Sequence, residues 1–405
     1  MQYSKLRQIL KSPFWVIYAL LVVLFFSKKL MVGWDSSEYL ALGKFIFGGL
    51  GYASWYRPLV WPLILGALWK IGLPMPFTMQ AVSILIYFSI PLITYFAFKD
   101  SRRYIGLLIV SQPVFFKYSH LPLSHIIASF FLILSYSTSG RKSGVFAALS
   151  GMSRFTFLLF LPFCLWYGKR RGDWKKRLTG MAIVLVPYFL FTTLYFHNPV
   201  IQFSGASDII NHPDYLWLWQ KDWLFYLKSL VFFSPLLLLV FWVKGPSRVA
   251  FLLSLIYFTL LPHKEDRFLI DMIIYAAIAI GEGFRKTPIL QSALHLIFLP
   301  LIFLPLYSPP AEFFTSIEPA TTVVGMDPIV NSYADIHFTS WFHYSSEPPM
   351  DADYCVFSKF GVPCPTDHEV CKSRVAYFKD TCDSWDIVGQ DWVFTVARRP
   401  SNATT

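Results

Sequence analysis

Long apolar runs alternate with short polar segments along most of the chain. A predominantly apolar stretch of about 20 residues is long enough to cross a bilayer as a helix. The pattern therefore predicts a polytopic α-helical membrane protein. The main runs are residues 14–26, 77–98, 104–118, 143–168, 178–196, 224–243, 249–261, 268–284 and 289–307.

Basic residues between the runs set the expected orientation. Lysine and arginine gather at 99–103, 141–142 and 169–177, and such clusters stay on the inner side of a membrane. We expect the N-terminus inside, about eleven spans, and the C-terminus outside. Residues 143–168 carry Arg154 between two basic clusters, which predicts two short helices meeting at Arg154. A single tilted span with an internal arginine is the alternative.

Composition supports a membrane protein. Hydrophobic residues make up 55% of the chain and charged residues 15%, and the mean hydropathy is +0.49. Soluble domains rarely combine these values. The net charge of +11 is explained by the orientation signals, so no nucleic-acid partner is expected.

The first external loop, residues 31–77, contains two amphipathic stretches at 36–47 and 59–71. We expect both to lie as helices on the outer membrane interface. Asp35 and Glu38 stand one helical turn apart at the start of this loop. Both carboxylates are therefore candidates to serve one external cavity, and a helix N-cap is the alternative role for Asp35.

A charged loop separates the apolar runs 249–261 and 268–284. Its ionisable residues are His263, Lys264, Glu265, Asp266 and Arg267. Charges beside a bilayer are costly unless they are paired or face a polar cavity. The loop is therefore expected to form a site, with a solvated interfacial turn as the alternative.

The segment from His263 to Phe268 resembles the His-Lys-Glu-(Asp/Glu)-Arg-Phe loop of the dolichyl-phosphate-mannose-dependent mannosyltransferases, which are members of the membrane-embedded GT-C superfamily. The match covers six consecutive residues. GT-C enzymes also carry an acidic residue just after the first span, then an amphipathic helix and an Arg-Pro pair. This chain has Asp35, the stretch 39–47 and Arg57-Pro58 in that order. The resemblance implies a GT-C-like transmembrane domain over residues 1–307.

The resemblance also implies a glycosyltransferase. Such an enzyme moves a hexose, here mannose, from a polyprenyl- or dolichyl-phosphate donor to a glycan, glycolipid or protein acceptor. It is a multi-pass protein of a prokaryotic plasma membrane or of the endoplasmic reticulum, and its active site faces outside or the lumen. A single displacement inverts the anomeric centre. No cofactor is expected, since the lipid-phosphate sugar is itself a substrate. No metal is expected either, because the second external loop offers His120, Ser124 and His125 but no second carboxylate.

The residues divide into expected roles. The acceptor hydroxyl needs a base, for which Asp35 is the first candidate and Glu38 the second. The negative lipid phosphate needs cationic or hydrogen-bonding partners. The candidates for this contact are Arg57, Arg154, His263, Lys264 and Arg267, and Glu265 and Asp266 are expected to orient these cations.

Two other functions compete with this interpretation. In a transporter or flippase of lipid-linked sugars, intramembrane charges line a pathway. The charges of this chain gather on one predicted side, which favours an external enzyme. A transferase resembling the O-antigen ligases, which uses a diphosphate-linked glycan, is the second alternative.

The C-terminal segment, residues 308–405, is expected to form a small external α/β or β domain, because short alternating apolar runs predict strands there. It carries Cys355, Cys364, Cys371 and Cys382. This even number suggests two disulfides in an oxidising compartment. A zinc site is the alternative, although the spacings lack a close Cys-x-x-Cys pair.

Overall fold

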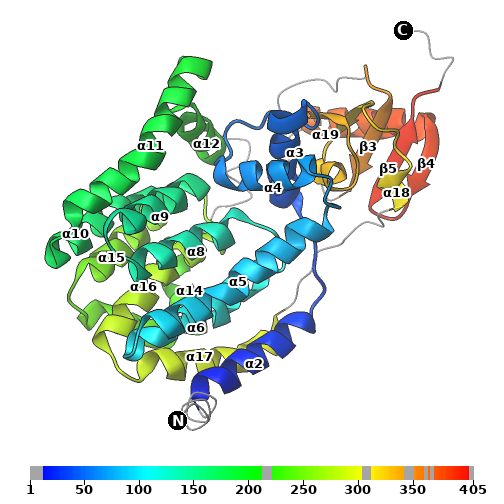
Figure 1. The fold of residues 1–405 in the computed structure, drawn as a ribbon. Coiled ribbons are helices and arrows are strands. Elements are labelled where there is room, and N and C mark those ends of the chain that lie inside the picture. The colour runs from blue at the N-terminus through cyan, green and yellow to red at the C-terminus, as the bar shows by residue number, and fades with distance from the viewer. Residues whose placement is uncertain are drawn as a thin grey trace. The chain divides into compact units, whose positions relative to one another are not determined.

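The computed structural model describes residues 12–211, 221–302, 312–341, 351–359, 364 and 369–400. The chain divides into two units. The first unit is drawn from Met1–Leu30, Val82–Asn211 and Leu218–Pro305, and the second mainly from Met31–Ala81 and Leu306–Thr405. Figure 1 shows the helices of the first unit and the mixed helix and strand composition of the second.

The first unit is helical. Its elements are α2 (Pro13–Phe26), most of α5 (Phe77–Ala97), η1 (Ser101–Tyr104), α6 (Ile105–Ser111), α7 (Pro113–Ser119), α8 (Ser124–Ser137), α9 (Gly140–Ser153), η2 (Phe155–Phe160), α10 (Leu161–Arg171), α11 (Trp174–Phe196), α12 (Ile201–Asn211), α14 (Phe225–Phe233), η3 (Pro235–Trp242), α15 (Pro246–Leu260), α16 (Phe268–Gly283), α17 (Thr287–Phe298) and η4 (Leu299–Leu301).

Helix α16 is the central element of the first unit. Its residues are buried from Phe268 to Gly281, and it packs against elements that include α15, α6 and α8. An α-helix that is apolar on nearly every side belongs in a protein interior. The charged loop ends where this buried helix begins, so its position is fixed by the packing of α16.

The helix break predicted at Arg154 is present. Helix α9 ends at Ser153, Arg154 adopts an extended conformation, and η2 and α10 continue the chain. Two other predicted runs are also broken. Gln112 and Ser234 leave the helical conformation directly before Pro113 and Pro235, because a proline disfavours helical geometry in the residue that precedes it.

The described helices are consistent with membrane spans, whereas the expected number of spans stays a prediction. In the described part of the chain, α5 and the segment Trp174–Leu194 of α11 are long and apolar enough to cross a bilayer. The bent pairs α7 with α8 and α14 with η3 raise this number to at most four. Shorter apolar helices, such as α2 and α15, accompany them.

The second unit joins Met31–Ala81 to the C-terminal segment. Its elements are α3 (Trp34–Gly48), α4 (Val60–Lys70), α18 (Glu312–Thr315), β1 (Thr322–Gly325), η5 (Pro328–Ser332), β2 (His337–Ser340), β3 (Tyr354–Ser358), α19 (Glu369–Ser384), β4 (Asp386–Gln390) and β5 (Phe394–Arg398). The two amphipathic stretches predicted in the first external loop are thus the helices α3 and α4.

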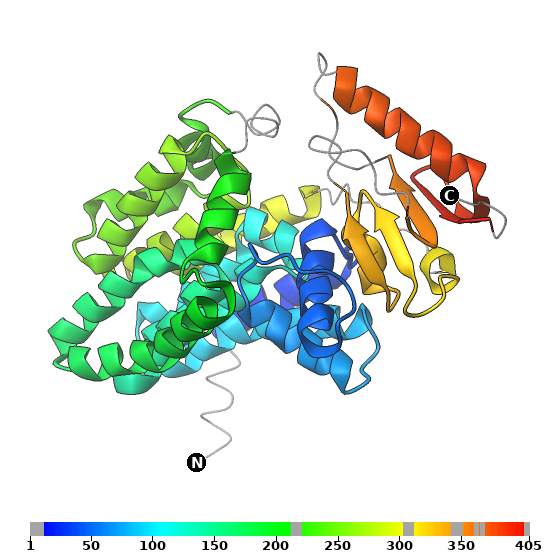
Figure 2. The same ribbon diagram turned by 90° about the horizontal axis from the view of Figure 1, so that it is seen from above.

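The strands form one mixed sheet in the order β2-β1-β3-β5-β4. Strand β1 pairs in parallel with β2 and β3, and β5 pairs antiparallel with β3 and β4. Helix α19 lies along this sheet (Figure 2) and contacts β3, β4 and β5. The small C-terminal α/β domain expected from the sequence is therefore present.

Two disulfides link the cysteines of this domain. Cys355 on β3 is bonded to Cys382 on α19, and Cys364 is bonded to Cys371. The prediction of two disulfides is confirmed and the zinc alternative is wrong. Cys355 and Cys382 are fully buried in the core between helix and sheet.

Helices α3 and α4 approach closely because a glycine of each faces the other. A Cβ atom on Gly43 would lie 2.5 Å from the Pro62 carbonyl oxygen, and one on Gly66 would lie 2.5 Å from the Gly43 carbonyl oxygen. No side chain larger than hydrogen fits at such a contact. The segment between these helices carries Arg57, which the packing brings back toward the start of α3.

Candidate active site

Two carboxylates, those of Asp35 and Glu38, lie together with the guanidinium of Arg57 in the second unit. These three residues are called the acidic group below. Arg57 reaches both carboxylates: its Nη2 lies 2.6 Å from Asp35 Oδ1, and its Nε lies 2.6 Å from Glu38 Oε2. One guanidinium thus bridges two carboxylates that stand one turn apart on α3. Burial opposes the charge on Arg57, but these two carboxylates outweigh it and raise its pKa well above the usual value.

The two carboxylates differ in their surroundings. The Glu38 side chain is fully buried, whereas the Asp35 side chain is 15% exposed. Besides Arg57, the hydroxyl of Tyr52 donates to Glu38 Oε1 at 2.8 Å, and the hydroxyl of Tyr56 donates to the same oxygen. Burial and hydrogen bonds therefore fix the Glu38 carboxylate in place, and Asp35 is the more accessible of the two.

Asp35 is not the N-cap of its helix. Helix α3 begins at Trp34 with Gly33 in the N-cap position, so Asp35 is the second helical residue. The capping alternative for Asp35 is wrong for this reason. Its negative charge still lies in the first turn, where the helix dipole favours an anion.

A third carboxylate of the second unit, Asp327, was not predicted. It is 8% exposed and accepts a hydrogen bond from the backbone N–H of Ile329 at 3.0 Å, which caps η5. Burial raises the pKa of Asp327 to about 7, and the negative charge of Glu38 adds to this effect. Sequence alone gives little signal for it, since Asp before Pro is common at the start of a turn.

The charged loop from His263 to Arg267 lies in the first unit and is called the basic group below. Arg267 donates through Nη2 to Glu265 Oε1 at 2.7 Å, and its Nε lies 2.5 Å from Glu265 Oε2. His263 Nε2 lies 2.6 Å from Glu265 Oε1. Burial opposes the charge on Glu265, but Arg267 and His263 outweigh it and lower its pKa. Glu265 thus holds two of the predicted phosphate-binding residues together.

The other charged residues of the loop have separate partners. Asp266 forms an ion pair with Lys117 of α7 at 2.9 Å, and the hydroxyl of Tyr118 donates to Asp266. Lys264 Nζ donates to the Leu261 carbonyl at 2.9 Å. The loop is therefore joined to α7 by Asp266 and is not a freely solvated turn.

Arg154 lies on the same unit and pairs with an acid that was not predicted. Its Nε lies 2.8 and 2.7 Å from the two carboxylate oxygens of Asp271 on α16. The hydroxyl of Thr156 also donates to Asp271 at 2.7 Å, and the Arg154 guanidinium lies 5.5 Å from the centre of the Phe268 ring. An acidic residue inside an otherwise apolar helix is the sequence signal that identifies Asp271.

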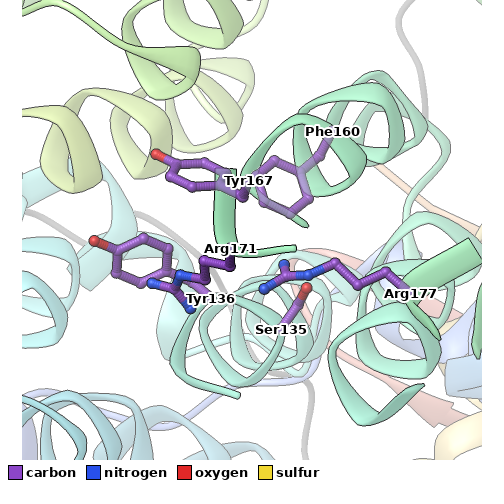
Figure 3. Close-up of a pocket in the computed structure, with 6 residues that line it drawn as sticks. All are labelled: Ser135, Tyr136, Phe160, Tyr167, Arg171 and Arg177. Carbon is purple, nitrogen blue, oxygen red and sulfur yellow. The ribbon is translucent and has the colours of Figure 1, made fainter. Parts of the chain in front are cut away.

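A small hollow between α8 and α10 does not belong to either group. It is lined by residues that include Tyr136, Tyr167 and Arg177, as Figure 3 shows. It has no room for a water molecule. The hydroxyls of Tyr136 and Tyr167 both donate to Glu282 at 3.0 Å, so the hollow is part of a packed polar network and not a substrate site.

No protein-family model matches this chain, and no curated protein sequence matches it. Solved structures do match. The crystal structure of ArnT from Cupriavidus metallidurans bound to undecaprenyl phosphate aligns with a TM-score of 0.63 and 10% identity, over 96% of this chain and 98% of that one. The apo structure of the same protein aligns with a TM-score of 0.53 and 11% identity, over 94% and 97% of the two chains. The chain therefore has a fold like that of ArnT along nearly its whole length.

Proposed function

We propose that this chain is an integral membrane glycosyltransferase that transfers a sugar from a polyprenyl-phosphate donor to an acceptor hydroxyl. The observation that carries this proposal is the fold, which is shared over nearly the full length of both chains with ArnT, a glycosyltransferase whose structure holds undecaprenyl phosphate. Mannose is the proposed sugar, because the loop from His263 to Phe268 resembles the mannosyltransferase motif.

The acidic group would serve the acceptor. In the proposed step the acceptor hydroxyl gives its proton to Asp35 while its oxygen forms a bond to the anomeric carbon. The bond from that carbon to the phosphate oxygen breaks, and the electron pair stays on the phosphate. This single displacement inverts the anomeric centre. Asp35 is preferred over Glu38 because Glu38 is fully buried and accepts hydrogen bonds from two tyrosines and Arg57.

The charged loop and Arg154 would serve the donor. The phosphate gains negative charge as the sugar leaves, and cations in a dry environment stabilise such charge strongly. Arg154 and Arg267 are the favoured phosphate contacts, because a guanidinium matches the phosphate oxygens in a fork. His263 and Lys264 are further candidates. Arg57 instead neutralises Asp35 and Glu38, with which it is already paired.

The proposed activity is tested with purified protein in proteoliposomes. Radiolabelled polyprenyl-phosphate mannose is supplied with a panel of glycan, glycolipid and protein acceptors, and a nucleotide-linked mannose serves as the control donor. We expect label transfer from the lipid donor, release of polyprenyl phosphate, and no transfer from the nucleotide sugar. Transfer from the nucleotide sugar, or failure of the protein to bind any polyprenyl phosphate, would contradict the proposal.

A further inference from the structure

Two basic side chains of the first unit, His125 and Arg154, carry buried nitrogen atoms that have no hydrogen-bond partner in the described part of the chain. His125, in the first turn of α8, is 2% exposed. Neither of its ring nitrogens has a hydrogen-bond partner among the described residues, and the same holds for Nη2 of Arg154. Buried polar atoms are nearly always paired in folded proteins, so such atoms point to a ligand or to ordered water.

The surroundings connect both side chains to the charged loop. The charges of Arg154 and Arg267 lie close enough to act on the His125 ring. The ring of Tyr118 lies roughly parallel to that of His125, with centroids 6.5 Å apart and planes inclined by 21°. The Tyr118 hydroxyl in turn donates to Asp266 of the loop. His125 thus lies beside the basic group without being part of its motif.

The cationic side chains around His125 each form an ion pair with a carboxylate. Among the described residues, Arg154 is paired with Asp271, Arg267 with Glu265, and Lys117 with Asp266. The pair with Asp271 is made through Nε of Arg154, which fixes the guanidinium while Nη2 is left to another acceptor. Donors from an imidazole and a guanidinium, next to cations, fit an anion better than a neutral ligand, since charged partners form stronger hydrogen bonds with them.

We propose that His125 and Nη2 of Arg154 bind the phosphate of the polyprenyl-phosphate lipid. The inference rests on the proposed function and adds a residue outside the charged loop to the donor site. A ring N–H of His125 donates to one phosphate oxygen and Nη2 of Arg154 to another. Both hydrogen bonds strengthen when the bond to the sugar breaks, because the electron pair that stays on the phosphate adds negative charge to its oxygens.

The test measures binding of polyprenyl phosphate to the full-length protein in nanodiscs, without donor turnover. A hydrogen bond to a charged group is worth about 1.5 to 3 kcal/mol, so His125→Phe should weaken binding by about ten- to a hundredfold. Ser129→Ala is the matched control, because Ser129 is buried one turn further along α8 and donates to the His125 carbonyl. The control should bind like the wild type.

A second variant and a competing ligand complete the experiment. If His125→Phe does not fold, His125→Met, which is flexible and also lacks a donor, takes its place. Excess inorganic phosphate is added as a competitor; we expect weak competition, and His125-dependent binding of inorganic phosphate without binding of the lipid would overturn the lipid assignment. Wild-type affinity in the apolar variants would overturn the role of His125 and leave the glycosyltransferase proposal standing. Absence of lipid binding by the wild type would instead defeat both.

Discussion

Lys44 of α3 forms an ion pair with Asp335, in which Nζ and Oδ1 lie 2.7 Å apart. The same ammonium also donates to the carbonyls of Asn331 and Ala334 at 2.7 and 2.8 Å. All three of its N–H donors thus have acceptors in the C-terminal segment. Ser37 adds a hydrogen bond of 2.8 Å to Ser332. The helix that carries Asp35 is therefore held by the segment around η5.

Replacing Lys44 should loosen this attachment. Lys44→Met leaves the carbonyls of Asn331 and Ala334 without their donor, and an unsatisfied buried acceptor costs about 1 to 3 kcal/mol. We expect a lower melting temperature for Lys44→Met and little change for Lys70→Met, because Lys70 is exposed at the end of α4. Equal melting temperatures for the two variants would show that the contacts of Lys44 do not stabilise the second unit.

Asp327 should make stability depend on pH. The folded protein keeps a proton on Asp327 up to about pH 7, whereas an unfolded chain releases it near pH 4, roughly. Folding raises the pKa of Asp327. The contribution of this carboxyl to the free energy of unfolding is therefore complete below about pH 4 and is lost as the pH rises to about 7. Asp327→Asn should flatten this decline in thermal unfolding, and Asp386→Asn, at an exposed position on β4, should preserve it. An unchanged pH dependence in Asp327→Asn would refute the assignment.

The two disulfides should differ in their effect on stability. Cys355–Cys382 closes a separation of 27 residues and Cys364–Cys371 one of 7 residues. In the chain-entropy model the longer loop stabilises more, by about 1 kcal/mol. Replacing both members of the first pair by alanine should therefore lower the melting temperature more than the same change in the second pair. The reverse order would mean that local packing outweighs loop entropy.

Glu38 and Asp35 should respond differently to loss of charge. Glu38→Gln places an amide among Tyr52, Tyr56 and Arg57 in a fully buried position, so one hydrogen bond is lost or reversed and the Arg57 charge loses a partner. Asp35→Asn affects a side chain that is partly exposed. We expect a clear fall in melting temperature for Glu38→Gln and a small one for Asp35→Asn, measured on detergent-solubilised protein. A larger fall in Asp35→Asn would reverse the structural assignment of the two carboxylates.

Sequence predicted the parts of the fold that local chemistry decides. The break at Arg154 follows from an arginine within an apolar run, and the loop from His263 to Arg267 follows from charge density between two such runs. Helices were expected at 36–47 and 59–71, and α3 and α4 are found there, although α3 is buried on every side from Ser36 to Lys44 and is not amphipathic. Short alternating apolar runs predicted strands within residues 308–405, and β3 is one of the strands found there.

Sequence did not predict the partners that tertiary packing selects. The pairing of Arg57 with Asp35 and Glu38 spans 22 and 19 positions, and that of Arg154 with Asp271 spans 117. Asp271 stands out as an acid in the apolar run 268–284, but the sequence does not show that Arg154 is its partner. The buried position of His125 depends on the packing of α8 and not on its neighbours in sequence.

The central claim is that Asp35 is the base of a polyprenyl-phosphate-dependent glycosyl transfer. The most direct measurement is the single-turnover transfer rate of Asp35→Asn beside the wild type, with polyprenyl-phosphate binding measured on the same preparations. The amide keeps the shape of the side chain and accepts from Arg57, but it cannot take the acceptor's proton. We predict a rate lower by about 10² to 10⁴ with unchanged lipid binding. A rate near that of the wild type would contradict the account.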